Sequence, residues 1–201
     1  MVWASRWTLH GPSGPTDSSV RTRAERITHG PHMGDPLQQT RAWLRDVVVK
    51  LSLCPYAAEP LQRGRVRFAA STATRADEAW RDLMLEAERL ATAEPSSVQT
   101  TLLILPNWDT DFLDFWEATQ DAEELLSDTT LSVALQLVAF HPTFRFGDTE
   151  HDDPANGVNR SPHPMWHLLR ADDVAEVVHN DPSVHDLPDR NRALLRSLAG
   201  G

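Results

Sequence analysis

The segment from His141 to Arg170 gathers many of the side chains in this chain that can do acid–base or ligand chemistry. It begins where the most apolar run of the sequence ends, and a connection of roughly 20 residues is long for a compact domain. A histidine at the end of a buried strand can act as a general acid or base, and a neighbouring carboxylate can orient its ring. We therefore take His141 as the candidate catalytic residue and Asp152 or Asp153 as its orienting partner.

Arg160 is the candidate anion-binding residue of the same segment. A guanidinium holds a carboxylate or a phosphate through two parallel hydrogen bonds, and the adjacent Asn159 can add a further polar contact. The implied ligand is a small anionic molecule. The other candidate ligand-binding residues are Asn107, Asn156, Ser161, His167 and Arg170. The alternative is that these side chains only satisfy the backbone of a pinned loop, and that Arg160 pairs with a nearby acid.

A metal site is a second interpretation of these residues. Two imidazoles and a carboxylate suit iron, manganese or zinc, and such a set can be drawn from His141, His163, His167, Asp152 and Asp153. The weak alternative that we retain is His141, Asp152 and His167. Pro164 favours the first position of a helix, which makes His163 a cap that points away from His167. The sequence identifies no other cofactor.

Cys54, the single cysteine of the chain, is a candidate nucleophile by residue type. Its expected position at the end of the first helix raises the pKa of the thiol, because the helix dipole is negative there. A buried cysteine that packs as a small hydrophobic side chain is the better interpretation.

Three short apolar runs predict buried strands, at residues 65–70, 98–105 and 131–140. Apolar residues at helical spacing predict a first helix from Pro36, which ends before Pro55. A capping pair of Thr74 and Asp77 predicts the start of a second helix, and Asp109 or Thr110 that of a third. The tail offers three further helical segments, at residues 165–170, 172–178 and 189–198.

This order of strand, helix, strand, helix and strand predicts an α/β fold with a small sheet of three or more strands and a βαβαβ core. The first helix and the C-terminal helices pack against that sheet. The strand order stays open, because a short strand hidden in the loop or the tail would allow an antiparallel, ferredoxin-like sheet. In a parallel arrangement, Ser71, Asn107 and His141 lie at the same edge of the sheet, because each follows the carboxyl end of a predicted strand.

Residues 1–35 differ in composition from the rest of the chain. Pro, Gly, Ser, Thr and Arg predominate there, and the apolar periodicity of a packed element is missing. We expect a disordered extension over residues 1–35 and one α/β domain over residues 36–201. We also expect Met33 to be the true initiator, because nothing upstream of it shows a packing pattern.

The formal net charge of −10 argues against generic binding to nucleic acid or to anionic membranes. No apolar run is long enough to span a bilayer, and the N-terminus lacks the apolar core of a secretory signal. One cysteine fits a reducing compartment. We therefore expect a soluble cytoplasmic protein, whose oligomeric state the sequence does not reveal.

Three short motifs carry a resemblance to a known family: Leu53-Cys54-Pro55-Tyr56-Ala57, Phe140-His141-Pro142, and Asn159-Arg160-Ser161-Pro162 followed by His167-Leu168-Leu169-Arg170. In this combination, the chain resembles the bacterial domain-of-unknown-function family 1415 from about Gln38 to Leu198. The resemblance implies a common fold and no known activity. His151 and His163 depart from the family pattern.

Two functional hypotheses remain open from the sequence. The first is an enzyme that acts on a small anionic metabolite at a pocket formed by residues 141–170, with His141 as acid or base and Arg160 as the anion holder. The second is a non-catalytic module that binds a ligand or a protein through the same loop.

Overall fold

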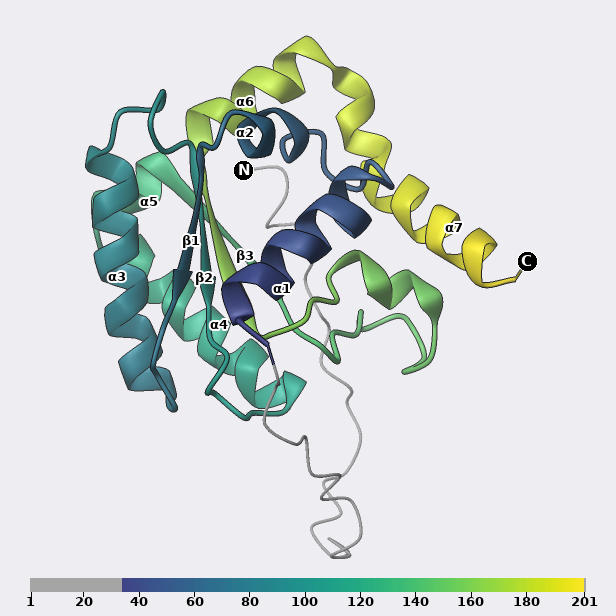
Figure 1. Cartoon of the computed structure of the whole chain (residues 1–201), viewed down its shortest axis with the longest axis horizontal. Coiled ribbons are helices and arrows are strands. Elements are labelled where there is room, and N and C mark those ends of the chain that lie inside the picture. The colour runs from purple at the N-terminus through teal and green to yellow at the C-terminus, as the bar shows by residue number, and fades with distance from the viewer. Residues whose placement is uncertain (1–33, 201) are drawn as a thin grey trace, which may run out of the picture.

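A four-stranded mixed sheet forms the centre of the fold in the computed structural model, which describes residues 34–200 (Figure 1). The expected extension lies outside this range, apart from its last two residues. In spatial order the strands are β1 (Val66–Ala70), β2 (Thr100–Ile104), β4 (Met165–Arg170) and β3 (Leu135–Phe140). β1 and β2 are parallel, whereas β4 is antiparallel to both β2 and β3. The three predicted strands therefore point in one direction, and the α/β class is confirmed.

The prediction of a helix at residues 165–170 is wrong, because these residues form β4 between two other strands. Met165, Trp166 and Leu168 are fully buried there. The apolar periodicity of a six-residue segment does not distinguish a buried helical turn from a buried strand. This segment forms a strand because it pairs with β2 on one side and β3 on the other. The short strand that the sequence left open in the tail is thus present, inside the sheet.

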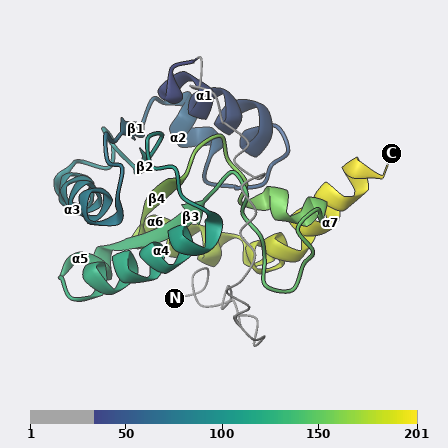
Figure 2. The same cartoon turned by 90° about the horizontal axis from the view of Figure 1, so that it is seen from below.

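One face of the sheet is covered by α3 (Ala76–Thr92), α4 (Phe112–Ser127) and the short α5 (Leu131–Ala134). These helices bury Leu83, Leu90, Phe115 and Ala122 against Leu103, Leu137, Trp166 and Leu168 in the larger core cluster. Figure 2 shows α3 and α4 side by side on this face. The predicted strand at 131–140 is shorter than expected, because its first four residues form α5.

The two predicted helix starts are displaced by one or two residues. α4 begins after Asp111, whose carboxylate accepts hydrogen bonds from the amides of Leu113 and Asp114 at 2.9 and 3.0 Å. Asp109 and Thr110 are therefore not the cap. α3 begins after Arg75 rather than Thr74, and the amide of Thr74 donates to the carboxylate of Glu78 instead.

The other face of the sheet is covered by α1 (Pro36–Trp43), its π-helical continuation η1 (Leu44–Val49) and the short α2 (Ala58–Gln62). Their apolar side chains pack on β1, β2 and the start of β4 through Leu44, Val48, Phe68, Leu102 and Met165. The chain then closes with α6 (Ala171–Asn180), the 3-10 turn η3 (Pro182–Asp186) and α7 (Leu187–Ala199). Figure 1 shows α7 beside the long loop between β3 and β4.

That loop contains the 3-10 turn η2 (Pro154–Val158), which begins after Asp153.

Across residues 34–200, no helix has the length and apolar character needed to cross a membrane.

Candidate functional site

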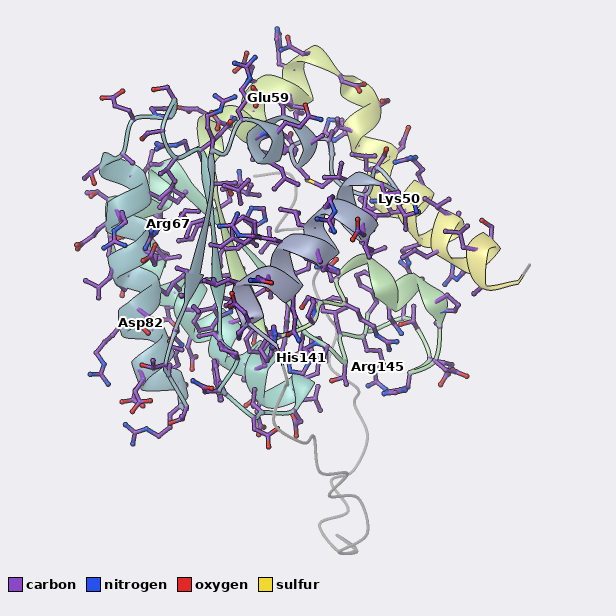
Figure 3. All side chains as sticks on the ribbon, viewed as in Figure 1. Lys50, Glu59, Arg67, Asp82, His141 and Arg145 are labelled. Atoms are coloured by element: carbon purple, nitrogen blue, oxygen red, sulfur yellow. The ribbon has the colours of Figure 1, made fainter. Side chains whose placement is uncertain are left out.

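His141 lies just beyond the carboxyl end of β3, at the lower end of the sheet in Figure 3. It is 3% exposed, and the rings of Phe112 and Phe115 lie 5.8 and 5.2 Å from its own. The amide of Thr143 donates to its Nδ1 at 3.2 Å. Burial lowers the pKa of His141 to about 4, although the Thr110 carbonyl and the Asp111 carboxylate favour the charged form. The imidazole is therefore neutral at pH 7 and packed among aromatic rings.

Asp153 holds the loop to α7 and does not contact His141. Its carboxylate receives two hydrogen bonds from Arg196, at 2.6 and 3.0 Å, and one from the amide of Ala155 at 2.9 Å. The Arg196 guanidinium lowers the pKa of Asp153 to about 2. Asp152, by contrast, is exposed to solvent.

Arg160 and Asn156 bind the backbone of their own loop. The Arg160 guanidinium donates to the carbonyls of Phe144 and His151, at 3.1 and 2.6 Å. Asn156 is fully buried, and its amide group accepts from the Phe146 amide and donates to the Glu150 carbonyl. These contacts are those of the pinned loop that the sequence analysis held as the alternative.

Three further candidates make structural contacts or lie exposed. Ser161 donates to the carbonyl of His163 at 2.7 Å, and Asn107 is exposed in the turn after β2. Arg170 donates to the carbonyls of Leu90, Ala93 and Val98, which ties β4 to the end of α3. Within residues 34–200 no three His, Cys, Asp or Glu side chains are gathered so that they could hold a metal ion. His141, Asp152 and His167 therefore do not form such a set.

Two adjacent cavities lie near β3 and β4, and the first, which we call the β3 groove, has a volume of about 140 Å³. Its walls come from α4 on one face of β3 and from the turn after η1, α6 and α7 on the other. The long loop closes one end of it. The lining residues outside the sheet are mostly apolar: Val48, Leu53, Cys54, Tyr56, Trp116, Thr119, Glu123, Phe144, Phe146, Val158, Asn159, Val174, Pro188 and Asn191.

The second cavity, which we call the α6 cavity, has a volume of about 170 Å³ and lies between the sheet, α2 and α6. His167 borders both cavities, and so do Cys54 and Tyr56. Of the candidate ligand-binding residues, Asn159 and His167 thus line the β3 groove, and His167 and Arg170 line the α6 cavity.

Cys54 carries a thiol that stays protonated at neutral pH. Burial raises its pKa to about 11, and the amides of Tyr56 and Ala57 act in the opposite direction without compensating. The direction agrees with the prediction from the sequence, and burial is its largest cause.

A family model described as "Protein of unknown function (DUF1415)" matches residues 35–200 of the chain. The chain belongs to this family. The resemblance carried by the three sequence motifs is thereby confirmed, and the DUF1415 match leaves the activity unassigned. No curated protein and no solved structure matches the chain.

The DUF1415 motifs contribute directly to both cavities. Cys54 and Tyr56 come from the first motif, Phe140 from the second, and Asn159 and His167 from the third. The aromatic side chains of the groove are not among the site residues predicted from the sequence, which are mostly polar. The alternating Phe144 and Phe146 after His141 are the signal that could have revealed an apolar wall.

Proposed function

We propose that this DUF1415 protein is a non-catalytic binding module that takes an extended peptide along the outer edge of β3. The proposal rests on one observation: β3 is the last strand of the sheet, and its outer edge lies in an apolar groove. Strand addition at an exposed sheet edge is a recurrent mode of peptide recognition.

Asn159 occupies part of the outer edge of β3 and leaves the backbone groups of Leu137 open. The carbonyl of Ala139 accepts from Asn159 Nδ2 at 3.0 Å, and the His141 amide donates to the Asn159 carbonyl at 3.2 Å. Both therefore face away from β4. Since backbone direction alternates along an antiparallel strand, the amide and carbonyl of Leu137 face the same way. No hydrogen bond from residues 34–200 occupies these two groups, so a peptide strand can pair with them.

The groove also suits the side chains of an added strand. Successive side chains of a strand point to opposite faces of the sheet. On one face they would meet Trp116 and Thr119 of α4, and on the other Leu53 and Val174. An incoming strand with small apolar residues would thus bury them on both sides.

The charge of α4 favours a basic peptide. This helix carries Asp114, Glu117, Asp121, Glu123 and Glu124 and no basic residue. No ion pair among residues 34–200 involves these acids. Glu123 lines the groove, whereas its neighbour Glu124 does not. We therefore expect the bound segment to carry Lys or Arg next to its apolar residues.

The test uses the full chain and a fluorescent synthetic peptide in which a run of valines is flanked by arginines, with binding followed by anisotropy. Glu123→Lys should weaken binding about tenfold, since reversing one partly screened charge changes the energy by about 1.4 kcal/mol. Glu124→Lys is the matched control and should change it by less than about threefold. Methylating the backbone nitrogens of the peptide on one edge should abolish binding. Equal binding of the methylated peptide would overturn strand addition.

The enzymatic hypothesis of the sequence analysis stays a prediction. It predicts that His141→Ala abolishes turnover of a small phosphorylated or carboxylate metabolite, with Asp152, Asp153 and Arg160 as further candidates. The hydrogen bonds of Arg160 and Asp153 to their own loop and to α7 favour the binding module. A cytoplasmic location is proposed on the same footing, supported by the single cysteine.

A further inference from the structure

The α6 cavity is a second, partly open space that the binding of a peptide at the edge of β3 does not require. It lies on the face of the sheet below α2 and α6, and its apolar wall includes Leu44, Val66, Leu102, Leu169 and Val177. Its volume of about 170 Å³ is close to that of an apolar cavity that binds benzene. A ligand of that size is a single ring with a small substituent.

His167 adds an imidazole ring to the lining of this apolar space, and it also borders the β3 groove. The hydroxyl of Thr100 donates its only proton to the Leu168 carbonyl at 2.7 Å. The 2.6 Å contact between Thr100 Oγ1 and His167 Nε2 must therefore use the proton of the imidazole. His167 Nδ1 is then the unprotonated nitrogen of a neutral ring.

The lone pair of Nδ1 is free to accept a hydrogen bond. No hydrogen bond from any of the described residues reaches it, and it is not among the fully buried polar atoms. His167 lies on a central strand, and the open spaces that it borders are the β3 groove and the α6 cavity. The hydroxyl of Tyr56 is unavailable for a competing contact, because it donates to the Val174 carbonyl at 3.1 Å.

We propose that the α6 cavity binds a small, uncharged ring compound with one hydrogen-bond donor, of the phenol class, and that His167 Nδ1 accepts from that donor. Glu59 on α2, labelled in Figure 3, also lines the cavity, but its carboxylate is paired with Arg63 and Arg65. Cavities of this type bind through apolar burial, and one placed acceptor sets the orientation.

The experiment compares phenol with toluene, which is its apolar counterpart, on the full chain by titration calorimetry. In His167→Phe, the affinity for phenol relative to toluene should fall at least about fivefold, because the buried donor then has no acceptor. His179→Phe, at an exposed position of α6, is the matched control and should leave this ratio unchanged. An unchanged ratio in His167→Phe would overturn the role of Nδ1.

Two further measurements keep the proposal testable if His167→Phe does not fold. Val177→Phe fills the α6 cavity and should abolish the binding of phenol and toluene alike. Phenol should also slow the alkylation of Cys54, which lines the cavity and is the single cysteine of the chain. Binding that persists in Val177→Phe, or alkylation at an unchanged rate, would place the ligand elsewhere. Neither result affects the outcome of the peptide test, which depends on Glu123 and on the backbone of β3.

Discussion

His141 and His167 follow the same electrostatic rule, although they face different surroundings. Burial lowers the pKa of each to about 4 from the ordinary value of 6.5. His141 is packed between Phe112 and Phe115 and receives a hydrogen bond at Nδ1, whereas His167 donates from Nε2 and keeps Nδ1 free. The neutral ring is thus a structural element in the first case and an available acceptor in the second.

The lowered pKa of His141 predicts a loss of stability in acid. Above pH 6.5 the ring is neutral in both states, so it contributes no pH dependence. Between pH 6.5 and 4 only the unfolded state gains the proton, and the free energy of unfolding falls by about 1.4 kcal/mol per pH unit. Over the whole window His141 accounts for roughly 3 kcal/mol. Below pH 4 the folded state is protonated too, and the slope ends.

Urea unfolding of His141→Asn at pH 7 and pH 4.5 measures this contribution. The asparagine keeps an acceptor for the Thr143 amide but does not titrate, so its stability should fall less between the two pH values than that of the natural protein. It should be less stable at pH 7, because it loses the ring contacts. His179→Asn, at an exposed site, should keep the natural slope. Parallel slopes for His141→Asn and the natural protein would refute the assignment.

At the scale of elements, the sequence predicts the helices and strands that follow from a local pattern of residues. It misses a strand that forms only because it pairs with strands distant in the sequence. α3 and α4 follow from their apolar spacing, and β2 from a continuous buried run. The segment that forms β4 has the same apolar content, and only its position between β2 and β3 makes it a strand. Asp109 and Asp111 are equally good helix caps by residue type. The packing of the buried Phe112 fixes the start of α4 and so makes Asp111 the cap.

The sequence shows which residue types are present at the candidate site, but it does not show which contacts their side chains make. Arg160 has the chemistry of an anion holder, but the carbonyls of Phe144 and His151 lie within reach of its guanidinium. Every residue has a carbonyl, so nothing in the sequence indicates which carbonyls a loop will turn toward a side chain. His167 and Asn159, in contrast, line the β3 groove, because β4 and the end of the loop bring them there, and their role in ligand binding stays a prediction.

The turn between η1 and α2 contains a strained residue that offers an element-scale prediction. Ser52 adopts φ 53°, in the left-handed region that glycine adopts readily and other residues adopt only at a cost in energy. Its side chain is exposed, so Ser52→Gly should stabilise the protein by about 0.5–1 kcal/mol. The same change at Ser197, within α7, should destabilise it by about 1 kcal/mol. A loss of stability in Ser52→Gly, measured by urea unfolding, would contradict the argument.

At the scale of the whole molecule, α7 connects the two segments that build the β3 groove. Arg196 binds Asp153 in the long loop, and Arg192 binds Asp148 at 2.7 Å. From the same helix, Asn191 Nδ2 donates to the Leu53 carbonyl at 2.7 Å, beside Cys54. α7 therefore positions the loop end and the turn end of the groove together, although it contributes no strand to the sheet.

Asn191→Ala is the substitution that tests this bracing role. Asn191 is 2% exposed, and its loss leaves the buried Leu53 carbonyl without its donor, which should cost about 2 kcal/mol of unfolding free energy. The peptide proposed for the β3 groove should also bind more weakly, because the turn at Leu53 is one of its walls. Asn180→Ala, at an exposed position, should leave both quantities unchanged. If stability fell while peptide affinity stayed constant, α7 would stabilise the fold without shaping the groove.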